Sequence, residues 1–192
     1  MKSARGKIME IIISDISYDN ISIDINQYID ELRSRAKEFA EDVQVEKTEI
    51  GYGADWPVYL LIIYGIFLQG KRISENLDSW ISIARKFCSF IEYIEDKFKA
   101  YRLDEEAATL VAINTIVKDM QGNINSIEKL SEEIIPVAPL EHRSPDHLDH
   151  RPYAMYLQTY KVNNQYVYIF GIKSKGTIEI ELKIDTTDWI EY

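Results

Sequence analysis

The sequence predicts an α+β fold in which a helical hairpin or bundle of three to four helices packs on a mixed or antiparallel sheet. Three patterns predict it: short β-branched segments near the start, apolar residues spaced by three and four in the middle, and strict alternation near the end. A chain of 192 residues suits one domain. The predicted parts are an N-terminal β-β-α-β region (about 7–50), a helical part (about 55–135), a Pro/His loop (136–152) and a C-terminal β-meander (153–184).

The N-terminal region begins with two predicted strands, at residues 7–14 and 20–25. The first is short and rich in isoleucine, and in the second isoleucines alternate with serine and aspartate. Apolar spacings of three and four then predict a helix over 26–42, followed by a strand over 43–50.

An uninterrupted apolar run of eleven residues occupies 58–68, after Pro57. A bilayer-spanning helix needs about 20 such residues, so the run is too short to cross a membrane. It is predicted as a buried central helix, in which Gly65 allows close helix packing. A partner-binding surface and a membrane-dipping segment are the alternatives.

Residues 72–101 show the most regular helical pattern in the chain. Their apolar seam comprises Leu77, Trp80, Ala84, Phe87, Ile91, Ile94, Phe98 and Tyr101. Such a seam fits an intramolecular hairpin with the preceding helix, and it also fits a homodimer through 77–101.

Two further helices are predicted before the Pro/His loop. Residues 104–121 begin with acidic side chains, which suit a helix N-terminus, and Gly122 ends the pattern. Asn125 and Glu128 resemble a capping box for a shorter helix over 126–135, which Pro136 stops.

The C-terminal third changes to a period of two. Strands are predicted over 153–162, 165–173 and 177–184, joined by an Asn163-Asn164 turn and a second turn at 174–176. These strands form a three-stranded antiparallel meander.

Charge and composition narrow the classes of function. Acidic residues outnumber basic ones by 32 to 22, for a net charge of −10, which disfavours nucleic-acid binding and favours a basic protein partner. The single cysteine, Cys88, excludes an internal disulfide and is predicted to pack in the core. The apolar run at the N-terminus is too short for a signal peptide, so a cytoplasmic location is expected.

All three histidines fall within nine residues of the Pro/His loop. His142, His147 and His150, with Asp146 among them, are candidate ligands for a divalent metal ion, the one cofactor that the sequence suggests. The alternative is a polar connector without any cofactor, because the spacing matches no known metal motif.

A weak nuclease-like pattern involves the same loop. Asp146, with Glu181 and Lys183 further on, matches the letters of a metal-dependent nuclease, in which two carboxylates hold the metal and a lysine lies near the attacking water. Any half-exposed strand gives the same alternation of Glu and Lys, so this match has little specificity. No phosphate-binding glycine loop and no serine elbow occur.

Tyrosines gather on the first two strands of the predicted meander. Tyr156, Tyr160, Tyr166 and Tyr168 are candidates for a partner-binding surface, or else for cross-strand packing. With no catalytic signature elsewhere, the sequence favours a protein-binding regulator, adaptor or immunity/antitoxin-type inhibitor. A divalent-metal-dependent hydrolase or nuclease using 141–150 is the alternative.

Overall fold

Helices and strands interleave along the whole chain. The computed structural model describes residues 8–14, 25–50, 58–66, 76–97, 100–136 and 154–187. Its elements in chain order are β1 (Ile8–Ser14), α1 (Ile25–Ala36), β2 (Glu41–Ile50), β3 (Val58–Ile66), α2 (Leu77–Lys97), β4 (Ala100–Leu103), α3 (Glu105–Asp119), β5 (Ile127–Pro136), β6 (Ala154–Val162), β7 (Tyr166–Lys173) and β8 (Ile178–Asp185). The predicted α+β class is confirmed, with three helices in the described ranges.

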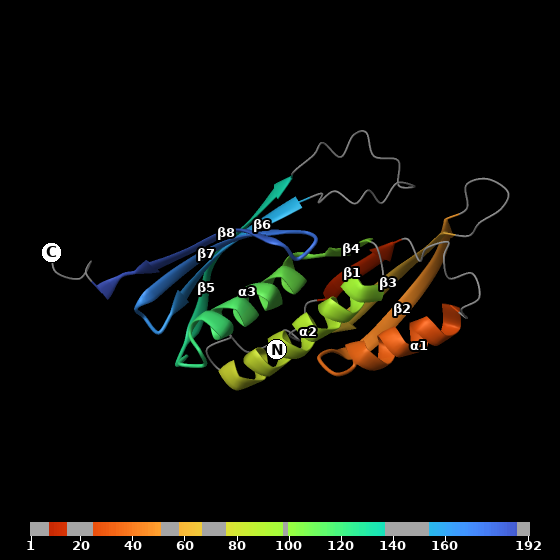
Figure 1. The fold of residues 1–192 in the computed structure, drawn as a ribbon, viewed down its shortest axis with the longest axis horizontal. Helices are drawn as coiled ribbons and strands as arrows, with labels where there is room; N and C mark the ends of the chain where they lie inside the picture. Colours follow the sequence, from red (N-terminus) through yellow and green to blue (C-terminus); the bar gives the residue numbers. More distant parts are fainter. Residues whose placement is uncertain are drawn as a thin grey trace, which may run out of the picture.

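The strands form two separate four-stranded sheets (Figure 1). The N-terminal sheet has the order β2-β3-β1-β4, and the C-terminal sheet has the order β5-β6-β7-β8. Every neighbouring pair in both sheets is antiparallel. The predicted meander is therefore part of a larger sheet, which β5 completes.

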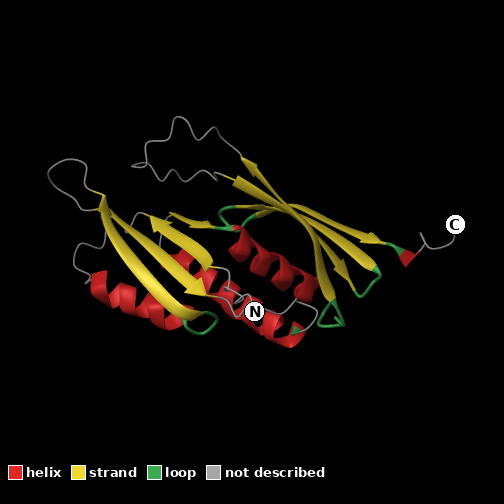
Figure 2. Cartoon of the chain, turned by 180° about the vertical axis from the view of Figure 1, so that it is seen from behind, coloured by secondary structure: helices red, strands yellow, loops and turns green. Residues whose placement is uncertain are grey.

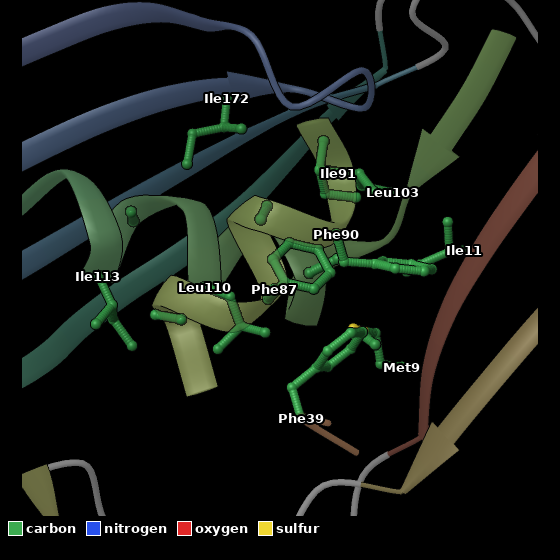
Figure 3. Close-up of a cluster of buried hydrophobic side chains, with 14 of the residues drawn as sticks. Met9, Ile11, Phe39, Phe87, Phe90, Ile91, Leu103, Leu110, Ile113 and Ile172 are labelled. Carbon is green, nitrogen blue, oxygen red and sulfur yellow. The ribbon is translucent and has the colours of Figure 1, made fainter. Parts of the chain in front are cut away.

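Helix α3 is the central element and contacts both sheets. It packs against β1 and β4 of one sheet, β6 and β7 of the other, and α2 along its side. Figure 2 shows the same arrangement from behind, with α1 and α2 beside the N-terminal sheet. Leu110 and Ile113 of α3 have no exposed surface and lie in a core that also contains Phe87 and Ile11 (Figure 3).

The predicted seam of α2 lies inside the protomer. Trp80, Ala84, Phe87, Ile91 and Ile94 are all buried in the shared core. Their burial within one chain favours the intramolecular interpretation of the seam over the homodimer through 77–101. The helix ends at Lys97, so the prediction that it continues to Tyr101 is wrong: Tyr101 belongs to strand β4.

The prediction of a helix over 58–68 is wrong, because residues 58–66 form strand β3. This strand pairs with β1 on one side and β2 on the other, so it is interior to its sheet. Interior strands also carry continuous apolar runs, and periodicity alone does not separate them from buried helices. The predicted helical hairpin with α2 therefore does not form. No helix in the described ranges is long and apolar enough to cross a membrane.

The helix predicted over 126–135 is also wrong, since these residues form strand β5, paired with β6. A bulge between Lys129 and Ser131 adds Leu130 to the strand and shifts its alternation. The shift leaves Ile127, Leu130 and Ile134 spaced by three and four, which imitates a helix. Asn163 accepts the backbone N–H groups of Asn125 and Ser126 at 2.7 and 3.2 Å, so the predicted helix cap instead joins two turns.

The remaining predicted elements are confirmed, with small shifts of their ends. β6, β7 and β8 form the meander, and Asn163 and Asn164 have φ values of 54° and 56°, as their hairpin turn requires. α1 and β2 occur in the predicted order, but α1 ends at Ala36 rather than at residue 42, and β2 begins at Glu41. The strand predicted at 20–25 lies outside the described residues except for Ile25, which begins α1.

Candidate functional site

The two faces of the C-terminal sheet differ in what covers them. Tyr156, Gln158 and Tyr160 of β6 point toward α3 and are buried. Because successive strand residues point to opposite faces, Met155 and Leu157 point the other way. The register extends this outer face across all four strands. Its apolar residues are Ile135, Met155, Leu157, Val167, Ile169, Ile180, Leu182 and Ile184.

None of the described elements covers this outer face. The helix that contacts β6 and β7 is α3, which lies on the inner side only (Figure 1). Ile180 and Leu182 are 42% and 47% exposed, and the other six residues are partly exposed. Ile180 also leans over Gly171, where a Cβ atom would meet it at 3.0 Å. The result is a continuous apolar surface of the kind that usually marks an interaction site.

The two strands that border the outer face are acidic. Together they carry six carboxylates and two lysines, but only Glu128, Glu133 and Glu179 lie on the outer face. The inner face holds Glu132, Glu181 and Asp185, together with Lys129 and Lys183. Both lysines are already paired with carboxylates, Lys129 with Glu132 at 2.5 Å and Lys183 with Asp119 at 2.7 Å. Among the lysines of the two central strands, β6 and β7, Lys173 is paired with Glu179. On the outer face the two border strands therefore carry three carboxylates and no lysine, which favours a basic partner.

The candidate partner-binding tyrosines lie mainly in the core. Tyr156, Tyr160 and Tyr168 are at most 2% exposed, and Tyr166 is partly exposed on the same inner face. The first three therefore cannot form an exposed aromatic surface, because α3 and the inner face of the sheet enclose them. Alternation along β6 and β7 places these tyrosines on one face, but the sequence does not say which face α3 covers.

Lys183 forms an ion pair with Asp119 of the same chain, which the sequence does not predict. Its Nζ lies 2.7 Å from Asp119 Oδ2 at the end of α3 and 4.5 Å from the centre of the Tyr166 ring. Tyr168 OH donates to the same carboxylate oxygen at 2.5 Å. These bonds lower the pKa of Asp119 and raise that of Lys183. Lys183 is thus protonated at neutral pH and links β8 to α3, unlike a lysine that serves as a base.

The other residues of the nuclease-like pattern are not brought together in the described structure. Glu181 lies on β8 with its side chain exposed, on the same face as Lys183. Asp146 and the three candidate metal ligands, His142, His147 and His150, lie outside the described residues. Among the residues that are described, no group of three or more His, Cys, Asp or Glu side chains is placed to hold a metal ion.

A buried polar network joins α3 to the inner face of the sheet. Gln158, which has no exposed surface, donates to Glu132 at 2.6 Å and accepts from Tyr160 OH at 2.8 Å. Lys129 donates to Thr109 and to Glu132 at 2.9 and 2.5 Å. Burial raises the pKa of Tyr160. The network bonds its members to one another, so it fixes the helix on the sheet.

Cys88 packs against the core, as the sequence predicts. Burial raises the pKa of its thiol to about 11, so little thiolate forms at neutral pH. A thiol in this state is a weak nucleophile.

Comparison with known proteins finds no relative of this chain. No protein-family model matches the chain, and searches of the curated proteins and of the solved structures find no match.

Proposed function

We propose that this protein has no catalytic activity of its own and acts by binding another protein through the outer face of the C-terminal sheet. The uncovered apolar face is the observation that supports the proposal. A regulator, an adaptor or an immunity/antitoxin-type inhibitor would all use such a surface. The partner is a protein with an apolar segment flanked by lysine or arginine.

The partner's basic character follows from the charges at the border of the face. On the outer face β5 and β8 carry three carboxylates, Glu128, Glu133 and Glu179, and no lysine, and the whole chain carries a net charge of −10. Opposite charges at the rim of an interface raise the association rate and select among partners, while the apolar centre supplies most of the affinity.

The proposal predicts that the outer face distinguishes between two peptides with the same apolar side. Two synthetic amphipathic helical peptides would be titrated, identical except that one has lysine and the other glutamate on the polar side. The lysine peptide is expected to shift backbone NMR signals of Leu157, Ile169 and Leu182. The glutamate peptide is expected to bind at least about tenfold more weakly, because its charge repels the rim.

A charge within the face provides the control. Leu157→Glu is expected to abolish the shifts, because a charge replaces a partly exposed apolar residue at the centre of the surface. Ser82→Glu on the exposed side of α2 makes the same addition far from the sheet and is expected to leave binding unchanged. Equal binding of both peptides, or shifts confined to other parts of the protein, would contradict the proposal.

A further inference from the structure

A surface groove runs between α2 and α3, the two helices that pack side by side (Figure 1). Its volume is about 420 Å³, which lies within the range of small-molecule sites, about 300–1,000 Å³. The lining residues come from α2, from α3 and from the turn that follows α3: Arg85, Cys88, Ser89, Glu92, Asn114, Val117, Lys118, Gln121 and Gly122. None of them belongs to the C-terminal sheet, so the groove is separate from the outer face.

Asn114 is a buried polar side chain in the lining of this groove. It is 6% exposed, and its amide contacts the thiol of Cys88. A thiol is a weak hydrogen-bonding group, and the Asn114 side chain bonds to no other group among the described residues. Buried amides are normally paired, and an apolar side chain would fill this position without a polar group to satisfy. The remaining bonds of the amide are therefore available to a ligand in the groove.

Two cations without carboxylate partners line the same groove. Within the described ranges, neither Arg85 nor Lys118 forms an ion pair or a side-chain hydrogen bond. By contrast, six other cations are each paired with a carboxylate: Arg33, Arg35, Lys97, Lys129, Lys173 and Lys183. Glu92 is the only acidic residue of the lining, so two cations oppose one carboxylate here, in a chain whose net charge is −10. This local excess of positive charge favours an anionic ligand.

The end of α3 presents few free acceptors that would oppose an anion. The carbonyl groups of residues 116–118 already accept N–H groups of the following turn. Gln121 has a φ of 51°, in the left-handed region that glycine favours just after a helix. Its side chain lines the groove, so a long amide is retained at a strained backbone position. Strain of this kind is concentrated at binding and catalytic sites.

We propose that this groove binds a phosphate monoester of a small hydroxylated molecule. The phosphate carries a charge of about −1.5 to −2 at pH 7, which suits two cations, whereas a carboxylate carries a single charge. Arg85 donates to the phosphate through its planar guanidinium group, and Lys118 adds a point charge from the other helix. The Asn114 amide and the Glu92 carboxylate bond to hydroxyl groups of the ligand. This site goes beyond the proposed binding function and does not depend on it.

Titration with matched probes tests the class of ligand. Two phosphate monoesters, AMP and glycerol phosphate, are compared with adenosine and glycerol, which lack the phosphate, at about 0.15 M salt. At least one ester is expected to shift the backbone NMR signals of Ser89, Asn114 and Gly122, and to bind at least about tenfold more tightly than its counterpart. No shift with either ester at about 10 mM, or equal binding of ester and counterpart, would overturn the proposal. The same shifts with sulfate at matched ionic strength would also overturn it, because they would indicate general attraction of anions.

Removal of single positive charges tests the two cations. Arg85→Gln and Lys118→Gln are each expected to weaken binding of the ester by about tenfold or more, because each removes a charge-assisted hydrogen bond. Lys161→Gln removes the same charge from β6, where the lysine is likewise unpaired among the described residues, and is expected to leave binding unchanged. An equal effect of all three variants, or no effect of any, would contradict the assignment of Arg85 and Lys118 to the site.

Asn114→Leu separates ligand binding from folding. Leucine has a similar size but no polar atoms, so the variant is expected to keep or raise the free energy of unfolding, measured with urea. Its binding of the ester is expected to weaken by about tenfold, because the amide no longer bonds to the ligand. A variant that binds the ester as tightly as wild type, whatever its stability, would overturn the assignment of Asn114 to the site.

Discussion

Replacing Phe87 with aspartate is expected to unfold the protein. Phe87 has no exposed surface and packs edge-on against Phe39 at 5.5 Å between ring centres. Removing a buried phenylalanine side chain costs about 3–5 kcal/mol, and an unpaired buried carboxylate adds several more. That sum is comparable with the whole stability of a typical protein, about 5–15 kcal/mol.

Circular dichroism and urea unfolding measure the effect. Ser82→Asp places the same charge on an exposed position of the same helix, and it is expected to change the free energy of unfolding by no more than about 0.5 kcal/mol. Phe87→Ala is expected to retain the fold with a loss of about 3–5 kcal/mol. If Phe87→Asp instead gave a folded, soluble monomer from a dimeric wild type, α2 would be an interface between copies.

The sequence predicted those elements in which periodicity and local signals agree. In α2 the spacing of three and four continues over 21 residues. In the meander the alternation is supported by the Asn163-Asn164 turn, whose positive φ values asparagine tolerates well. Both predictions depend on local chemistry, which a single sequence contains.

The predictions failed where tertiary pairing decides between two conformations. The apolar run of 58–66 fits an interior strand and a buried helix equally well, and only the presence of β1 and β2 on either side makes it a strand. In β5 a single bulge converts an alternating pattern into a helical one. Neither the strand neighbours of β3 nor the bulge in β5 can be inferred from the local sequence.

The sequence contains a signal for the outer face. Strand β7 is apolar at both alternating sets of positions, Val167 and Ile169 on one side and Tyr168 and Phe170 on the other. A sheet in an α+β fold that has a helix on only one face leaves the second set uncovered. The number of helices available to cover two sheets was not predictable, because it required knowing that α3 serves both of them.

Asp104 provides the second large expected effect, because it joins α3 to the N-terminal sheet. One carboxylate oxygen caps the helix by accepting Ala107 N–H at 2.8 Å, and the other accepts Glu10 N–H of β1 at 2.6 Å. Asp104→Ala is expected to lower the free energy of unfolding by about 2–4 kcal/mol. The lost cap contributes about 0.5–2 kcal/mol, and the Glu10 N–H left without its partner contributes about 1–3 kcal/mol.

The same carboxyl group is expected to make stability depend on pH. Burial raises the pKa of Asp104 to about 6, although its two backbone hydrogen bonds act in the opposite direction. Between the ordinary value of about 3.8 and about 6, the folded protein binds more protons at this group than the unfolded chain does. Asp104 therefore contributes stability that is complete below about pH 4 and is lost as the pH rises through 6. The loss is about 2–3 kcal/mol.

Asp104→Asn separates this contribution from those of the other acidic groups. Asparagine still caps a helix but does not ionise, so the variant lacks the loss of stability that Asp104 causes between about pH 4 and pH 6. Its free energy of unfolding is therefore expected to rise relative to wild type as the pH increases across that range. The carboxyl ¹³C signal of Asp104 should titrate near pH 6. A titration midpoint at or below pH 4 would mean that the two backbone hydrogen bonds outweigh burial, and the difference between the two proteins would then stay constant from pH 4 to pH 6.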